Sequence, residues 1–252
     1  MERNALTEYL NSYLEVEKFR DYCPKGMVIE GSEDVKKVIT AVSFCEELVD
    51  IAEQESADML IVHHPHGFWD NQKKLPIGSM RRKLLRMLKN NISLLAYHLP
   101  LDAHPEVGNN VELIHALGMK PIFPFMKYNG AFIGWAGEFP HTVSLDVLTE
   151  KVTGCIGKPV YVSEGVKRKI SRVGVCSGGA PEGVIESLDL GLDAYITGES
   201  REHIHHFAKE EQIHYLACGH HNTEVFGPRA LADHIRKNCP VEVKFVDIPN
   251  PL

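Results

Sequence analysis

The sequence lacks the marks of several large classes of protein. Its six cysteines are spread along the chain and form no CxxC pair, which argues against a disulfide framework and favours reduced, buried thiols. A formal net charge of -7 provides no general attraction to nucleic-acid phosphates. No apolar run is long enough to span a membrane, and residues 1–19 have the pattern of an amphipathic helix rather than a secretory signal. We therefore expect a cytoplasmic protein without a membrane or nucleic-acid partner.

The chain is an ordinary globular sequence in which strand and helix patterns alternate. With 252 residues, of which 44% are hydrophobic and 24% charged, it is long enough for one large domain or two small interlocked ones. The alternation favours an α/β fold with mostly parallel sheets covered by helices. Strands are predicted at residues 36–44, 57–65, 92–100, 171–179, 192–200, 213–221 and 241–247, and helices at residues 1–19, 46–57, 79–91, 109–119, 181–191, 201–211 and 228–238. Between them, residues 128–162 are predicted to form a strand, a loop, a helix and a strand.

The two halves of the chain follow a similar order of elements. In each half, one strand runs directly into polar residues, as LIVHHP and AYITGES show, which is typical of an old duplication. No low-complexity linker separates the halves, so we expect them to pack closely and to be able to exchange terminal elements. The predicted halves are residues 1–125, which carry His63, His64 and Asp102, and residues 126–252, which carry His220 and Glu224.

Polar residues follow the carboxyl ends of several predicted strands. In parallel sheets the crevice beyond these ends is the usual place for a ligand. Pro65 stops the strand that ends in the adjacent His63 and His64, which allows both imidazoles to turn into one cleft. The other strand ends are followed by His98 and Asp102, by Gly178 and Gly179, by Glu199, and by His220 and Glu224.

Five of these residues have the chemistry of metal ligands: His63, His64, Asp102, His220 and Glu224. His220 and Glu224 are four apart and share one face of a helical turn. Five donors that include a carboxylate able to bridge are more than one tetrahedral ion requires, and they suit two ions about 3.5–4 Å apart. The alternative is that each residue is structural, because isolated histidines and loop aspartates usually are, and only the fold can bring the clusters together.

Several segments occur in the order found in the NIF-three-like family, whose members are often labelled GTP cyclohydrolase type-two homologues. They are IVHHP, HLPLDAHPEVGNN, CSGGA, ITGE followed by His203, and GHHNTEVFG, and the resemblance covers nearly the whole chain. It implies the same five metal ligands, two interlocked α/β halves with a pair of metal ions in the cleft between them, and a homohexamer. One segment departs from the family: DYCPKGMVIEG stands where relatives often have DNVGLQVG, so that a relative's substrate need not carry over.

The resemblance implies a metal-dependent hydrolase that binds two divalent cations per chain. Zinc, iron and manganese all suit imidazole with carboxylate. On GTP, a water activated by the metal ions would attack C8 of guanine, open the imidazole ring and release formate toward a dihydroneopterin triphosphate. His98 and Glu199 are the candidates for moving protons, and His98 is equally a candidate for orienting Asp102. Candidates for substrate contacts are Gly178, Gly179, Trp69 and His203.

Two other functions use the same ligands. One is a metal-binding accessory or regulatory protein that turns nothing over, and the other is a dinuclear phosphoesterase that acts on nucleotides. The cleft around Trp69, His98 and Gly179 distinguishes them, because a catalyst needs open coordination positions and a pocket of substrate size.

Overall fold

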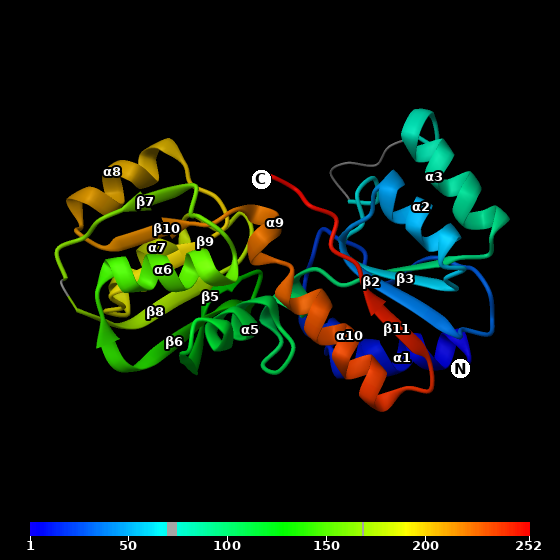
Figure 1. The fold of residues 1–252 in the computed structure, drawn as a ribbon, viewed down its shortest axis with the longest axis horizontal. Coiled ribbons are helices and arrows are strands. Elements are labelled where there is room, and N and C mark those ends of the chain that lie inside the picture. Colours follow the sequence, from blue (N-terminus) through cyan, green and yellow to red (C-terminus); the bar gives the residue numbers. More distant parts are fainter. Residues whose placement is uncertain (70–74, 168) are drawn as a thin grey trace. The chain divides into compact units, whose positions relative to one another are not determined.

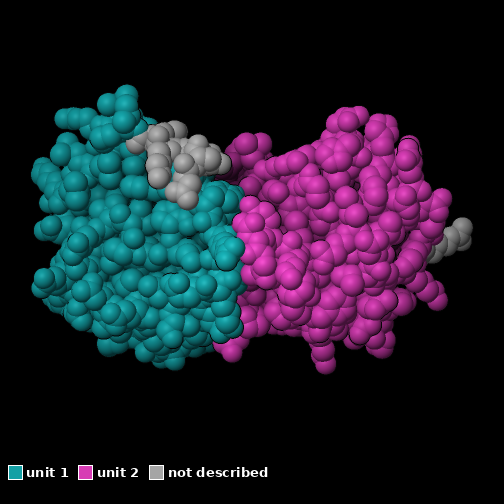
Figure 2. All heavy atoms as spheres, turned by 180° about the vertical axis from the view of Figure 1, so that it is seen from behind, with its two compact units in different colours: residues 1–101, 227–249 teal, residues 102–226, 250–252 magenta. Residues whose placement is uncertain are grey.

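The chain forms two compact units, each built around its own sheet (Figures 1 and 2). The structure is a computed structural model that describes residues 1–69, 75–167 and 169–252. Unit 1 consists of residues 1–101 and 227–249, and unit 2 of residues 102–226 and 250–252. The α/β class predicted from the alternating pattern is confirmed. The division differs from the expected boundary after residue 125, since Asp102 belongs to unit 2 and a C-terminal segment returns to unit 1.

Unit 1 contains a five-stranded sheet in the order β1-β4-β3-β2-β11. The pairs that join β4, β3, β2 and β11 are parallel, and only β1 is antiparallel to its neighbour. The strands are β1 (Gly26–Ile29), β2 (Lys37–Ser43), β3 (Met59–His64), β4 (Ser93–Ala96) and β11 (Glu242–Phe245). The helices are α1 (Arg3–Tyr13), the 3-10 helix η1 (Val16–Lys18), α2 (Glu46–Gln54), α3 (Gly78–Lys89), α4 (Leu99–Ala103) and α10 (Phe226–Asn238). Helix α4 crosses into unit 2.

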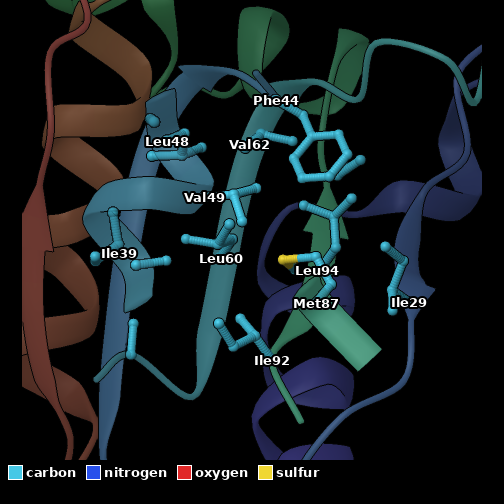
Figure 3. Packing of buried hydrophobic residues seen from close by; sticks show 14 of the residues in the cluster. Ile29, Ile39, Phe44, Leu48, Val49, Leu60, Val62, Met87, Ile92 and Leu94 are labelled. Carbon is cyan, nitrogen blue, oxygen red and sulfur yellow. The ribbon is translucent and has the colours of Figure 1, made fainter. Parts of the chain in front are cut away.

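A hydrophobic core fills one face of this sheet beneath α2 and α3 (Figure 3). Alternate residues of a strand point to the same face, and on β3 these are Leu60 and Val62. They pack with Leu48 of α2 and Met87 of α3, and all four side chains are almost completely buried. Because every residue of β3 is buried, the strand that ends in His63 and His64 is held on both faces.

The helices α1 and α10 lie on the opposite side of the sheet (Figure 1). Two buried polar groups of the strands hydrogen-bond to them. The hydroxyl of Thr40 donates to the carbonyl of Pro228 at 2.8 Å, and the hydroxyl of Tyr97 donates to Oδ1 of Asn11 at 2.9 Å. After α10 the chain forms β11, which pairs in parallel with β2. The C-terminal segment therefore completes the edge of the first sheet.

Unit 2 contains a six-stranded sheet in the order β5-β6-β8-β9-β10-β7. Only β8, β9 and β10 pair in parallel, whereas the sequence predicts mostly parallel pairing. The difference comes partly from the β5–β6 hairpin, whose turn residues Asn129 and Gly130 both have positive φ, the signature of a tight hairpin turn. At the other edge of the sheet, β7 pairs antiparallel with β10. The strands are β5 (Lys120–Tyr128), β6 (Ala131–Val143), β7 (Tyr161–Ser163), β8 (Ile170–Cys176), β9 (Ala194–Thr197) and β10 (His214–Ala217).

The helices of unit 2 follow the predicted order along the chain. They are α5 (Asn109–Ala116), α6 (Leu145–Cys155), α7 (Gly183–Asp189), α8 (Glu202–Glu210) and the single turn α9 (His220–Thr223). Helix α5 contacts β6 and β8, and α7 contacts β8 and β9. In the described ranges, no helix combines the length and apolar character that crossing a membrane requires.

The core of unit 1 predicts a large cost for a cavity beneath β3. Leu60→Ala is expected to lower the free energy of unfolding by about 2–5 kcal/mol, because Leu60 is fully buried in the cluster. Leu85→Ala on α3 is the matched control. Its side chain is 54% exposed, so the change should stay within about 0.5 kcal/mol. The measurement is the midpoint of chemical denaturation, and equal shifts for the two variants would contradict this account of the core.

Candidate metal centre

The chain turns sharply directly after His64. Pro65 has no N–H to continue the ladder of β3, and the N–H of His66 donates back to the carbonyl of His64 at 3.0 Å. The same carbonyl accepts the N–H of Phe44, which follows β2, at 2.9 Å. The end of β3 is thereby tied to its neighbour. The rings of His63 and His64 lie with their centroids only 4.5 Å apart, although adjacent residues of a continuing strand point to opposite faces.

His98 completes a group of three buried histidines in unit 1. It follows β4, the neighbour of β3, and its ring centroid lies 5.1 Å from that of His63 and 5.7 Å from that of His64. One nitrogen of each ring can be chosen so that all three lie within 4.8 Å of one another. We name His63, His64 and His98 the three-histidine group. The sequence singled out all three residues, but assigned His98 to proton transfer or to the support of Asp102.

Two rings of the three-histidine group are oriented by acceptors on their Nδ1 side. Nδ1 of His63 lies 3.0 Å from the carbonyl oxygen of Tyr97, and Nδ1 of His98 lies 3.0 and 3.1 Å from the two carboxylate oxygens of Asp21. Because these oxygens only accept, each Nδ1 carries the hydrogen, and in the neutral ring the lone pair is on Nε2. Histidines that bind metal ions are usually held in this way, by an acceptor on the nitrogen away from the ion.

Asp21 was not predicted from the sequence. It lies in the divergent segment DYCPKGMVIEG, and its side chain is completely buried. Besides His98, its carboxylate accepts the backbone N–H groups of Cys23 and Leu99, each at 3.0 Å. Burial alone would raise the pKa of Asp21, but the hydrogen bond from His98 and the two backbone N–H groups outweigh burial and lower it. Asp21 is thus a carboxylate that orients His98 and anchors the start of α4.

In unit 2, His220 begins the helical turn α9 and Glu224 directly follows it, so that the two side chains come together as their spacing predicts. Nε2 of His220 lies 3.2 Å from Oε1 of Glu224. On the other side of the ring, Nδ1 lies 2.6 Å from Oε1 of Glu199, which follows β9. Burial alone would lower the pKa of His220, but the carboxylates of Glu224 and Glu199 outweigh burial and raise it to about 10. The two carboxylates thus surround this imidazole with negative charge, which attracts a cation, and a metal ion that binds the ring would displace its proton.

The backbone at the end of β8 lies directly against this pair. Gly178 has a φ of +64°, and a Cβ at this position would come within 2.2 Å of Oε1 of Glu224 and 3.0 Å of Nε2 of His220. Its N–H donates to the hydroxyl of Thr223, and the preceding N–H, of Ser177, donates to Oδ1 of Asn110. Gly178, predicted to contact the substrate, therefore serves close packing here, and the N–H groups of Ser177 and Gly178 already have acceptors within the protein.

Asp102 lies in α4 and accepts two hydrogen bonds within unit 2. Nδ2 of Asn109 donates to its Oδ1 at 2.8 Å, and the hydroxyl of Ser177 donates to the same oxygen at 3.0 Å. All three residues are buried. The sequence identified Asp102 but neither of its donors, which are polar residues of common types at a helix start and a strand end.

The remaining candidates lie in different surroundings. His203 is on α8, and Nε2 of its ring lies 3.8 Å from Oε1 of Glu182, which also binds Arg201. A Cβ on Gly179 would lie 3.5 Å from Oε2 of Glu199, which places this glycine beside His220 and its partner. Trp69 belongs to unit 1 and stands edge-on to His98, with 5.1 Å between the ring centroids. Of the four substrate candidates, Trp69 thus borders the three-histidine group.

The donors present fit a divalent transition metal. Imidazole nitrogens and carboxylate oxygens are the ligands that zinc, iron and manganese accept. In unit 1 the three-histidine group brings three nitrogens together, with two rings oriented at Nδ1. In unit 2 the ring of His220 has the same arrangement, with Glu199 at Nδ1 and Glu224 at Nε2. Each unit therefore carries a group of ligand character with its own supporting acceptors.

The comparisons with known proteins agree over the whole chain. The family model described as Duf34/NIF3 (NGG1p interacting factor 3) matches residues 1–251. A protein of Pseudomonas aeruginosa named GTP cyclohydrolase 1 type 2 homolog is 38% identical over 249 residues, which cover 98% of both chains. A protein of the same name from Escherichia coli K12 is 36% identical over the full length of both. The solved structure of the protein ybgI, of unknown function, superposes with a TM-score of 0.94 at 35% identity and covers 100% of both chains. These matches confirm the resemblance that the motifs predicted.

The close contact between Gly178 and Glu224 predicts that alanine destabilises the protein at this position. The same substitution at an open helical glycine should not. Gly178→Ala is expected to lower the free energy of unfolding by about 1–3 kcal/mol, because alanine is strained at a φ of +64° and its Cβ displaces the carboxylate of Glu224. Gly154→Ala on α6 is the control. A Cβ there meets no atom within 4 Å, so the change should be neutral or stabilise by up to about 1 kcal/mol. Denaturation of both variants measures the effect, and a neutral Gly178→Ala would contradict the geometry described.

Proposed function

The chain belongs to the Duf34/NIF3 family, and from this premise we propose that it is a hydrolase that binds two divalent metal ions and acts on a nucleotide. The observation that carries the proposal is the way in which hydrogen bonds orient the histidine rings. Three imidazoles, those of His63, His98 and His220, have an acceptor on Nδ1. In the neutral rings of His63 and His98 this leaves the lone pair on Nε2, and at His220 a metal ion would displace the proton that Nε2 shares with Glu224. Surface or core histidines do not require such uniform orientation.

The proposed ligands are the five that the motifs indicated, with His98 added to them. The family resemblance assigns His63, His64, Asp102, His220 and Glu224 to one dinuclear centre, and the three-histidine group supports a further nitrogen from His98. Bound ions would lower the pKa of a coordinated water toward neutrality and polarise the substrate. Zinc, iron and manganese are all compatible with this donor set.

The residues around the ligands hold and move protons. Asp21 keeps the hydrogen of His98 on Nδ1, and Glu199 does the same for His220. The side chain of Glu199 is half exposed, so that this carboxylate is accessible to solvent while it bonds to a ring of the site. We infer that Glu199 is the group that moves a proton between the site and water, whereas the buried Asp21 serves only to orient His98.

Aromatic rings beside the three-histidine group support a planar substrate. Tyr22 stacks on Trp69 with 5.1 Å between the ring centroids, and it meets His98 edge-on with 5.4 Å between the ring centroids. Tyr22 is 39% exposed, whereas Trp69 is buried. An exposed ring supported from behind by a second ring is a platform on which a nucleobase can stack. GTP, which the names of the relatives suggest, is the first substrate to test.

The first prediction concerns metal content. The purified protein, loaded with Zn²⁺ or Mn²⁺ and dialysed, is expected to hold two ions per chain by elemental analysis. His63→Ala and Asp102→Ala should each lose at least one ion, because each removes a proposed ligand. His115→Ala is the control, since this exposed histidine pairs with Glu112 away from the proposed ligands, and it should retain both ions. Two ions per chain in both ligand variants would refute the assignment.

The same samples separate the three functions with a turnover assay on GTP and a panel of nucleotides. Formate release that disappears in Asp102→Ala supports the cyclohydrolase, and phosphate release that disappears in this variant supports the phosphoesterase. Full metal occupancy without turnover supports an accessory protein instead. The homohexamer implied by the resemblance and the cytoplasmic location expected from the composition remain predictions, and light scattering of the purified protein tests the first.

The aromatic platform generates a separate prediction. Tyr22→Ala is expected to raise the KM for a nucleotide substrate about tenfold, because stacking of one base contributes roughly 1–3 kcal/mol. Tyr22→Phe should keep the wild-type KM. Tyr128→Ala on β5 removes a tyrosine that is also 39% exposed and should have no effect. Steady-state kinetics with the metal-loaded protein measures the three variants, and an unchanged KM in Tyr22→Ala would exclude the platform.

A further inference from the structure

We propose that Ser177 and Asn109 are positioning residues for Asp102, which restrict it to binding metal through Oδ2 alone. The inference rests on the proposed function, because it concerns a metal ligand, but the contacts that carry it lie entirely within unit 2. It changes the role expected for Asp102 from the sequence. A carboxylate with two accessible oxygens can bridge two cations with one oxygen on each, whereas a carboxylate with one oxygen occupied cannot.

Both donors converge on one atom. Nδ2 of Asn109 lies 2.8 Å from Oδ1 of Asp102, and Oγ of Ser177 lies 3.0 Å from the same Oδ1. An ionised carboxylate has about four lone-pair sites, two on each oxygen. The two donors account for both sites of Oδ1. They also fix the rotation of the carboxylate about its last bond, so that the direction of Oδ2 is set before any ligand arrives.

A third residue, Asn110, holds the backbone of Asp102 and of the donor Ser177 in place. The amide of Asn110 is fully buried, and its Nδ2 donates to the backbone carbonyls of Asp102 at 3.2 Å and Ile133 at 2.7 Å. Its Oδ1 accepts the N–H of Ser177 at 2.7 Å. Asn110 thus joins the backbone that carries the ligand to the backbone that carries one of the donors. The two segments are 75 residues apart in the sequence.

The loop between Asp102 and Asn109 folds back, so that its last residues lie close to its first. The N–H of Gly108 donates to the carbonyl of His104 at 3.0 Å, and Nδ1 of His104 accepts the N–H groups of Glu106 and Val107. A Cβ on Gly108 would lie 2.3 Å from the carbonyl oxygen of His104 and 2.9 Å from that of Asp102. Glycine is therefore required for the close approach that brings Asn109 to the carboxylate.

These hydrogen bonds admit a purely structural reading, in which they only stabilise unit 2. A second buried serine distinguishes the two readings. Ser187 on α7 is fully buried and donates to the carbonyl of Gly183 at 2.9 Å, without contact to a proposed ligand. Ser→Ala at either position removes one buried hydroxyl donor. The structural reading predicts similar consequences for both, whereas positioning predicts a loss of metal affinity at Ser177 only.

The experiment compares wild type, Ser177→Ala, Ser187→Ala and Ser177→Thr by equilibrium dialysis against Mn²⁺ and, in a parallel series, against buffered Zn²⁺. Ser177→Ala is expected to weaken the affinity of at least one ion about tenfold or more, the usual effect of losing a group that orients a ligand. Ser187→Ala should keep wild-type affinity. Ser177→Thr retains the hydroxyl and should recover most of the loss. Thermal unfolding of the metal-free proteins monitors the structural effect separately.

The outcomes separate this inference from the proposed function. Wild-type protein that binds neither ion overturns both. Wild-type binding of two ions, with equal affinity in Ser177→Ala and Ser187→Ala, overturns the positioning role and leaves the hydrolase proposal intact. If Ser177→Ala does not fold, Asn109→Ala removes the other donor and is judged by the same tenfold criterion. A loss confined to Ser177→Ala and Asn109→Ala supports the inference.

Discussion

The candidate site depends on the hydrogen bond at the Nδ1 side of its histidines. The acceptor differs each time: a backbone carbonyl for His63, a buried carboxylate for His98 and a half-exposed carboxylate for His220. For His63 and His98 the contact determines the tautomer, and with it the atom that carries the lone pair. The ring of His220 lies between two carboxylates, which favour its protonated form. An imidazole without such an acceptor can rotate or change tautomer, at a cost in affinity for any ion. The ends of β3 and β4 place the rings of His63 and His98 in unit 1, and the end of β9 and the helical turn α9 place Glu199 and His220 in unit 2.

Much of the fold was predictable because local patterns carry it. The alternation of strands and helices from residue 36 onward, and the break at Pro65, follow from residue type and periodicity. Strands β1 and β5 were missed, since GMVI lies in a loop-like segment and β5 contains two prolines, although the dipeptide Asn129-Gly130 indicates the hairpin. The division into units was not predictable either, because pairing of β11 with β2 joins segments about two hundred residues apart and no local pattern records it.

The candidate metal ligands were predictable from the sequence, whereas the residues that orient them were not. Histidines and carboxylates at strand ends are conspicuous in a sequence. Asp21 and Ser177 are not, because each acts through a partner more than seventy residues away. A sequence shows which residues have the chemistry of a ligand, whereas the direction in which each lone pair points depends on tertiary contacts. His98 illustrates the difference. Its place after a strand indicates a functional residue, but only the contact with Asp21 shows how its ring is oriented.

The return of the C-terminal segment to unit 1 sets an order of events during synthesis. All of unit 2 except its last three residues is made before α10 and β11, so that the strand nearest the C-terminus joins a sheet whose other strands were made first. Until then β2, whose other neighbour is the strand that ends in His64, has an unpaired edge on the nascent chain. A chain truncated before residue 242 therefore lacks β11 and leaves β2 as an exposed edge of the histidine-bearing sheet.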